Sequence, residues 1–210
     1  NTKPPGWMKF ILKKVFSNNI PVIVLSPVEQ QAISAEYNLK NVKVLPNCVD
    51  LNEAKIYNRT INKQEVLNIL FIGRITKSKG IEYIYQALSS LKKRQVPFKF
   101  YIAGAGPEEK EYVEKFEVLL GSDFEFKGVV AGVSKINLFK TCEIFLLPSL
   151  FEGLPMSLLE SMSFGLVPVV TGVGSIKHVV KTGENGILVD RNPAEDIDLA
   201  IEKFVNDRML

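Results

Sequence analysis

Two basic residues follow the first long apolar run of the chain. Arg74 and Lys79 come after the run at 66–72 and directly before a stretch with helical periodicity. Arginine forks onto two phosphate oxygens and lysine acts as a point charge, while the N-terminus of a helix already favours anions. Gly73 lets the backbone turn closely before Arg74. The loop predicts a diphosphate site without a metal, although solvated surface charges would give the same spacing.

Two glutamates form a second candidate site. Glu152 and Glu160 lie eight residues apart, and Gly153 and Pro155 follow the first of them. Pro155 suits the first turn of a helix over 155–164, which puts Glu160 about 7 Å further along that helix than Glu152. Such carboxylates can accept from hydroxyls at separate points of a long polyhydroxyl ligand, whereas a helix cap and a surface residue are the plain alternative. The amides expected to face the ligand are those of Gly153, Leu154 and Met156.

Three further motifs predict neither a cofactor nor a metal. The turn that begins at Gly104 has Glu109 in place of the third glycine of the dinucleotide fingerprint, so it predicts only a tight turn near a ligand. Asp196 and Asp198, two residues apart on a helix, point about 200° apart and cannot share an ion. The single histidine, His178, fits a structural or surface role better than acid-base catalysis. We therefore expect no cofactor and no metal.

Composition and charge exclude several classes of protein. The 210 residues are 46% hydrophobic and 23% charged, which is typical of a packed globular domain. A net charge of +3 is too small for the basic face of a nucleic-acid-binding protein. Cys48 and Cys142 lie far apart without other ligands nearby, so they predict neither a disulfide framework nor zinc and favour a reducing, cytoplasmic compartment. No apolar run reaches the roughly 20 residues of a membrane helix.

The residues with this chemistry follow short apolar runs. The runs lie at 66–72, 98–103, 123–126, 144–147, 167–171 and 186–189. Helical patterns lie between and after them, at 81–94, 107–119, 134–141, 155–164, 175–181 and 194–205. Strands that are apolar on both faces and alternate with helices predict a Rossmann-like, doubly wound α/β fold with a six-stranded parallel sheet. Ligands are then expected beyond the carboxyl ends of the strands.

The first 65 residues follow a different pattern. Residues 7–16 predict a short basic amphipathic helix, which could contact an anionic membrane surface but fits packing against the rest of the fold better. Strands at 21–25 and 42–45, with a helix between them, make a partial α/β unit with too few strands for a domain. The polar stretch 51–65 has little periodicity and predicts a linker.

Taken together, the motifs resemble glycosyltransferase family four, the group 1 type retaining glycosyltransferases of GT-B fold. The resemblance covers about Val22 to the end and keeps the motifs in the same order. The residues that carry it are Phe71-Ile-Gly-Arg74 with Lys79-Gly80, Ile102-Ala-Gly104-Ala-Gly106-Pro107, Leu147-Pro-Ser149 with Glu152-Gly-Leu-Pro155 and Glu160, and Gly183-Glu-Asn-Gly186. The two glutamates in this context are its most specific part.

The resemblance implies a role for each candidate residue. Arg74 and Lys79 would bind the diphosphate of a nucleotide-diphosphate sugar and Glu152 the transferred sugar, which makes these three the catalytic set. The resemblance also implies transfer without a metal and with retention of anomeric configuration, through an oxocarbenium-like transition state in which the two cations stabilise the leaving diphosphate. The implied substrate-binding set, with Glu160 on the ribose and the backbone near Gly128 on the base, is Gly73, Gly104, Gly128, Val129, Gly153, Leu154, Met156 and Glu160.

The same resemblance implies three segments of a larger protein. Residues 1–50 correspond to the terminal segment of the acceptor-side N-terminal domain, 51–65 to a linker, and 66–210 to the nucleotide-sugar donor-binding domain. Because most of the acceptor domain and the closing helix would be missing, we expect the chain to bind donor but to transfer little or no sugar. The full-length protein would use a sugar or lipid-linked acceptor in polysaccharide biosynthesis. The expected location is the cytoplasm, and peripheral contact with the inner face of the membrane is an open alternative.

Departures from the family pattern leave alternatives open. Cys48 and Ser175 each replace a glycine, and Lys177-His178 replaces Pro-Glu, so we expect local sugar contacts to differ. A nucleotide-sugar epimerase of the same fold is one alternative, but it needs acid-base groups in the cleft, where the sequence offers only His178. A non-catalytic nucleotide-sugar-binding module is the other.

Overall fold

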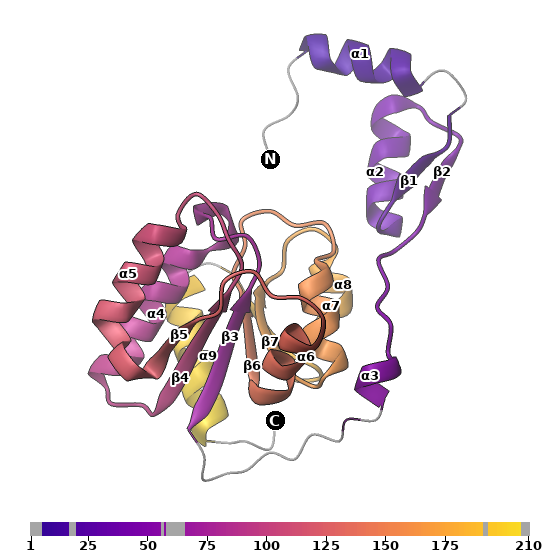
Figure 1. Ribbon diagram of the computed structural model, residues 1–210. Coiled ribbons are helices and arrows are strands. Elements are labelled where there is room, and N and C mark those ends of the chain that lie inside the picture. Colours follow the sequence, from indigo (N-terminus) through magenta and orange to yellow (C-terminus); the bar gives the residue numbers. More distant parts are fainter. Residues whose placement is uncertain (1–5, 17–19, 56, 58–65, 191–192, 207–210) are drawn as a thin grey trace. The chain divides into compact units, whose positions relative to one another are not determined.

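The computed structural model describes residues 6–16, 20–55, 57, 66–190 and 193–206 (Figure 1). Two compact units divide the chain, Asn1–Asn47 and Cys48–Leu210. Every residue of the predicted catalytic and substrate-binding sets lies in the second unit.

The first unit is a small α/β unit. Its elements are α1 (Gly6–Phe16), β1 (Val22–Val24), α2 (Pro27–Tyr37) and β2 (Val42–Val44). The two strands pair in parallel. Ser26 accepts a hydrogen bond from the amide of Glu29, whose carboxylate accepts one from the amide of Leu25, so α2 begins with a reciprocal cap. The rings of Phe16 and Tyr37 meet edge to face at 5.3 Å, which joins α1 to α2.

The second unit is built on a six-stranded parallel sheet. Its strands are β3 (Leu67–Ile72), β4 (Phe98–Ala103), β5 (Phe124–Phe126), β6 (Ile144–Leu147), β7 (Val167–Thr171) and β8 (Ile187–Val189). Their order in the sheet is β5-β4-β3-β6-β7-β8. The chain therefore moves outward from β3 to β5 and then returns to place β6 on the other side of β3. This reversal is the switch point at which doubly wound sheets bind ligands.

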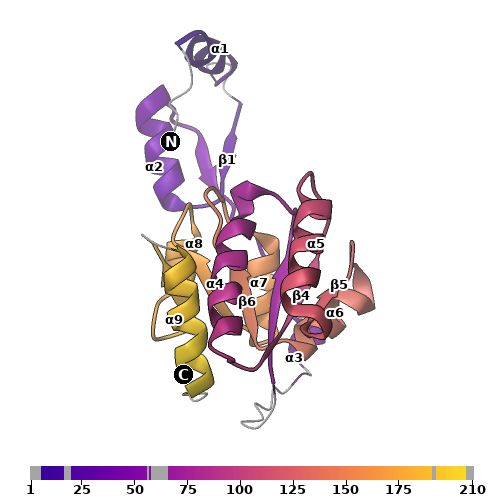
Figure 2. The ribbon, with the colours of Figure 1, turned by 90° about the vertical axis from the view of Figure 1, so that its left-hand side faces the viewer.

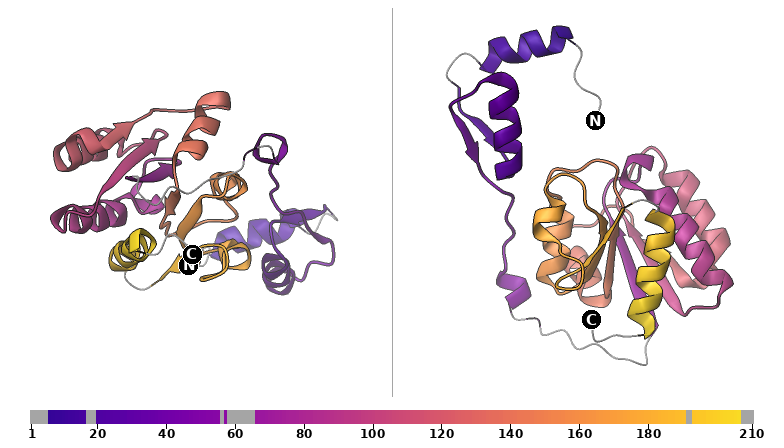
Figure 3. Two further views of the ribbon diagram at one scale, coloured as in Figure 1. Left: turned by 90° about the horizontal axis from the view of Figure 1, so that it is seen from below. Right: turned by 180° about the vertical axis from the view of Figure 1, so that it is seen from behind.

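Helices cover both faces of this sheet. Figure 2 shows α4 between α9 and α5 on one face, and Figure 3 shows α6, α7 and α8 on the other. The helices of the unit are α3 (Asn52–Lys55), α4 (Ile81–Lys93), α5 (Glu109–Leu120), α6 (Gly132–Thr141), α7 (Met156–Ser163), α8 (Ile176–Val179) and α9 (Pro193–Asn206), with short 3-10 turns η1 (Lys77–Lys79) and η2 (Gly121–Asp123). Among the described helices, none is long and apolar enough to cross a membrane.

The core explains why the strands read as continuous apolar runs. Phe71, Phe100 and Phe145 on three neighbouring strands are fully buried, as expected for a sheet that is covered on both faces. Helix α4 buries Ile84 and Leu88 at the four-residue spacing of an amphipathic helix. The ring of Phe100 packs 4.9 Å from that of Phe116 on α5, which fixes that helix against the sheet.

The predicted fold class is confirmed, with small differences at the boundaries. All six predicted strands are present and each begins within one residue of its predicted run. Helix α5 begins two residues later than predicted, at Glu109, because the amide of Glu108 bonds to the carbonyl of Ile75. A one-turn helix, α3, lies inside the segment predicted to be a linker, and its Ala54 is buried in the core of the second unit.

Candidate functional site at the carboxyl ends of β3 and β6

The loop after β3 is held against the loop after β6 by backbone contacts. Gly80 has φ +77°, and a Cβ added to it would lie 2.0 Å from the carbonyl oxygen of Pro148. Only glycine allows this approach without moving one of the loops. The amide of Leu150 also donates to the carbonyl of Ser78 at 2.8 Å. The two loops that carry the predicted cations and the first predicted acid are therefore one packed structure.

Glu152 lies at the centre of this structure. Its Oε1 is 2.5 Å from Nζ of Lys79 and 2.7 Å from Oγ of Ser149. The Glu152 side chain is 8% exposed and that of Lys79 is 26% exposed, so the pair is well shielded from water. Thr171 on β7 donates to the carbonyl of Ser149, which ties the loop to the next strand. The sequence predicts Lys79 and Glu152 at one site, and the structure places them in direct contact.

The loop after β7 packs against the backbone of Glu152. Gly174 has φ +55°, and a Cβ there would lie 2.0 Å from the carbonyl oxygen of Glu152. The buried Ser175 donates its amide to the carbonyl of Gly153 at 2.9 Å. The contact of Ser175 does not require glycine, because the close approach to the backbone of Glu152 is made by Gly174.

Arg74 differs from Lys79 in its surroundings. Its side chain is exposed at the carboxyl end of β3, and within the described part of the chain it forms no ion pair or side-chain hydrogen bond. A guanidinium without a carboxylate partner keeps its donors for an incoming anion. Of the two predicted cations, Lys79 is therefore fixed on Glu152 and Arg74 is open to a ligand.

The start of α7 differs from the prediction. The sequence predicts Pro155 in the first helical turn, but the structure places it at the N-cap position with φ −67° and ψ 133°, and the helix begins at Met156. The carbonyl of Pro155 accepts the first helical hydrogen bond, from the amide of Leu159, as the carbonyl of an N-cap residue does. Leu154 is buried, whereas the side chain of Met156 is 41% exposed.

Glu160 lies one turn into α7 and has its own cation. Its Oε1 is 2.7 Å from Nζ of Lys135, which is in the first turn of α6. Both side chains are partly buried, at 24% and 29% exposed. The two predicted acids are therefore paired with different lysines. The sequence does not predict Lys135, because its pairing depends on how α6 and α7 pack on the sheet.

The loops after β4 and β5 adjoin the loop after β3. Gly104 has φ +135°, and a Cβ there would lie 1.8 Å from the carbonyl of Gly73. The amide of Gly104 donates to the carbonyl of Gly128 at 2.7 Å. Val129 is 78% exposed and borders a pocket of about 600 Å³ between α6 and the strands β4 and β5, which Tyr101 also lines. Burial raises the pKa of the Tyr101 hydroxyl.

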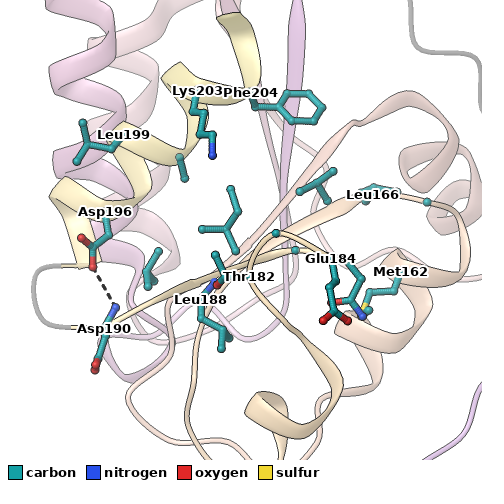
Figure 4. Close-up of a pocket in the computed structure, with 18 residues that line it drawn as sticks. Met162, Leu166, Thr182, Glu184, Leu188, Asp190, Asp196, Leu199, Lys203 and Phe204 are labelled. Atoms are coloured by element: carbon teal, nitrogen blue, oxygen red, sulfur yellow. Dashed lines mark hydrogen bonds between the residues drawn. The ribbon is translucent and has the colours of Figure 1, made fainter. Parts of the chain in front are cut away.

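A second pocket lies away from these residues. It has a volume of about 580 Å³ and lies between β8, α9 and the start of β7 (Figure 4). Leu188 and Leu199 contribute apolar surface, and the amide of Asp190 donates to Asp196 at its rim. None of the predicted catalytic or substrate-binding residues lines this pocket.

The remaining polar motifs of the sequence are placed as follows. Asp196 accepts from the backbone, whereas Asp198 accepts from Ser90 on α4 and from Arg94 at its C-cap, so the two acids point to different partners as predicted. His178 is exposed on the one-turn helix α8. Within the described residues no group of three or more histidine, cysteine or acidic side chains could hold a metal ion.

The fold and the site together define a class of protein. Solved structures with the same fold are glycosyltransferases of GT-B type. TarM of Staphylococcus aureus, bound to fondaparinux, α-GlcNAc-glycerol and UDP, superposes with a TM-score of 0.81 at 20% identity, over 95% of this chain and 39% of that one. HepE of Anabaena, bound to UDP and glucose, gives a TM-score of 0.75 at 19% identity, over 95% of this chain and 58% of that one.

The sequence comparison identifies the family. Residues 52–210, more than half of the chain, match the family Glycosyl transferases group 1, and the chain belongs to it. An uncharacterized glycosyltransferase of Methanocaldococcus jannaschii is 31% identical over 200 residues, which is 89% of this chain and 51% of that protein. A putative colanic acid biosynthesis glycosyltransferase of Salmonella typhimurium is 30% identical over 66% of this chain and 36% of that protein.

One further relative is named by its substrate. The N,N'-diacetylbacillosaminyl-diphospho-undecaprenol α-1,3-N-acetylgalactosaminyltransferase of Campylobacter jejuni is 25% identical over 84% of this chain and 45% of its own length. The chain thus spans about half the length, or less, of these curated relatives.

Proposed function

We propose that this chain binds the nucleotide-diphosphate sugar donor of a retaining glycosyltransferase of family four. The observation that carries the proposal is the contact between Lys79 and Glu152 at the switch point of the sheet, in the same loop assembly as the exposed Arg74. Ligands of doubly wound sheets bind at this point, and a diphosphate sugar carries both the anion and the hydroxyls that such groups recognise.

The roles follow from the charge that each group presents. Arg74 binds the diphosphate through its fork of donors, and Lys79 adds a second cation whose remaining protons are free to point away from Glu152. Glu152, fixed by Lys79 and Ser149 through one oxygen, accepts from a sugar hydroxyl with the other. The gain is largest in the transition state, when negative charge develops on the leaving diphosphate and positive charge on the sugar ring.

No metal is needed in this proposal. The leaving diphosphate meets the cations of Arg74 and Lys79 and the backbone amides of Gly153 and Met156, which can supply the stabilisation that a divalent ion gives in other phosphate sites. We place the ribose on Glu160 and the base near the backbone of Gly128 and Val129, beside the pocket of about 600 Å³.

The acceptor and the membrane belong to the same proposal. The C. jejuni relative is named for an undecaprenol-linked acceptor, and a sugar or lipid-linked acceptor of this kind is what we propose for the full-length protein, acting in the cytoplasm. In α1, Trp7 and Phe10 are 65% and 71% exposed, and Lys13 and Lys14 follow in the same helix. Exposed aromatic and basic residues on one short helix fit contact with an anionic membrane surface.

The alternatives of the same fold are separated by their chemistry. An epimerase needs a proton-transfer group near the sugar, and the exposed His178 has no hydrogen-bonded partner within the described residues that would orient it. A non-catalytic binding module would need only the nucleotide contacts. It would bind donor in the full-length protein without consuming it.

Titration calorimetry with UDP, ADP, GDP and their sugar conjugates tests the proposal. We expect one nucleoside diphosphate to bind, and Arg74→Ala to weaken it about 10- to 100-fold, the value of one or two charge-assisted hydrogen bonds. Lys115→Met on α5 removes a cation from an exposed ion pair outside the site and serves as the control. If no nucleoside diphosphate binds, or if both variants bind like the wild type, the proposal is wrong.

A further inference from the structure

Lys135 occupies an unusual position for a basic residue. It lies in the first turn of α6, where the helix presents its positive end and where neighbouring cations are disfavoured by about 0.3–1 kcal/mol. No acidic residue lies in that turn to compensate. A lysine at a position that the helix dipole disfavours indicates that another interaction at the same place needs its charge.

The partner of Lys135 is the acid that the proposed function places on the ribose. Nζ of Lys135 lies 2.7 Å from Oε1 of Glu160. The other carboxylate oxygen, Oε2, has no hydrogen-bond partner among the residues that the structure describes. One oxygen of Glu160 is therefore fixed and the other is open.

Helix α6 also connects this pair to the proposed base site. The loop that contains Gly128 and Val129 runs directly into α6, and Lys135 follows within its first turn. Lys135 is therefore linked to both ends of the proposed nucleoside site, to Glu160 by its ion pair and to the base loop by the chain.

We propose that Lys135 is a positioning residue for recognition of the ribose. Its ammonium holds Glu160 through Oε1 so that Oε2 is presented to the ribose hydroxyls, and the chain thereby distinguishes ribonucleoside from 2′-deoxyribonucleoside diphosphates. This inference rests on the proposed function, because it requires a nucleoside diphosphate at this site. An ordinary surface ion pair would contribute to stability only weakly and would not affect which sugar is bound.

The test compares binding of a ribonucleoside diphosphate with binding of its 2′-deoxy counterpart. The probe is whichever of UDP, ADP and GDP binds the wild-type chain most tightly, together with its 2′-deoxy form, measured by calorimetry. A hydrogen bond to a charged carboxylate predicts that the wild type prefers the ribonucleotide about tenfold or more. Glu160→Gln should reduce this preference.

Lys135→Met should reduce the preference to about twofold or less, and Lys135→Arg should restore most of it, because arginine can hold the same carboxylate oxygen. The matched control is Lys115→Met, which breaks a lysine–glutamate pair of the same 2.7 Å length on α5 and should keep the full preference. A Lys135→Met variant that keeps the wild-type preference, or that binds both nucleotides equally more weakly with the preference intact, overturns the inference. A wild type that binds no nucleoside diphosphate refutes the proposed function instead.

Discussion

Replacement of Gly80 by alanine tests whether the two loops of the site depend on their close approach. The new Cβ would lie 2.0 Å from the carbonyl oxygen and 2.7 Å from the carbonyl carbon of Pro148. Both atoms belong to the backbone, so the loop after β3 or the loop after β6 must move. We expect Lys79 and Glu152 to separate as a result.

The magnitude has two parts that a second variant can separate. A non-glycine residue in the left-handed region costs about 1–2 kcal/mol. The steric overlap adds about 1–3 kcal/mol, the usual cost of overpacking a close-packed region. Gly183 has a similar φ of +83°, but a Cβ there would meet no atom within 4 Å, so Gly183→Ala has only the first part.

Urea denaturation followed by circular dichroism measures the difference. We expect Gly80→Ala to be less stable than Gly183→Ala by about 1–3 kcal/mol, and to lose nucleoside diphosphate affinity that Gly183→Ala retains. Fluorescence is a poor probe here, because the single tryptophan, Trp7, lies in the first unit. Equal stability and equal binding of the two variants would refute the argument that the loops are held together at Gly80.

Three further predictions concern other contacts. Lys79→Met leaves the shielded carboxylate of Glu152 without its cation. The free energy of unfolding should therefore fall by about 1–3 kcal/mol, and diphosphate binding should be lost. Unchanged values in urea denaturation and calorimetry would contradict this. Burial, and then its hydrogen bond to Glu82, raise the pKa of Tyr112, so the folded state keeps a proton that the unfolded state loses above about pH 10. The free energy of unfolding should therefore decrease above this pH more steeply in the wild type than in Tyr112→Phe. Parallel pH profiles of the two proteins would show the assignment to be wrong. The chain should sediment with vesicles of anionic phosphatidylglycerol but not with vesicles of neutral phosphatidylcholine. A double variant, Trp7→Ala with Phe10→Ala, should sediment less with the anionic vesicles. Equal sedimentation of the wild type and the double variant would exclude α1 as the contact.

The sheet could be predicted from the sequence because its strands are buried on both faces. Continuous apolar runs such as 66–72 and 98–103 lack the alternation of apolar and polar residues that is typical of a strand with one exposed face. Helical patterns separate these runs. The strand order does not follow from such local patterns. The order places β6 beside β3, so that the loops after these two strands meet.

The candidate site was predictable where one local motif carries the chemistry. Two motifs of a few residues each predict it: Glu152 with the glycine that follows it, and the loop of Arg74. The structure brings Glu152 and Lys79 into contact. Lys135 was not predictable in this way, because its partner lies on another helix. Its position in a helical first turn without acids is the signal that the sequence did contain.

Pro155 shows the limit of a local rule. Proline is common at the first helical position, and the residue before it is then the cap. In this chain Pro155 is itself the cap, with the extended backbone that a cap requires, and the helix starts one residue later.

A crystal structure of the chain with a bound nucleotide-diphosphate sugar tests the central claim most directly. The diphosphate should lie within hydrogen-bond distance of Arg74 and Lys79, with the sugar on Glu152 and the ribose on Glu160. A donor bound in the pocket between β8 and α9, with Arg74 and Glu160 free of ligand, would contradict the account.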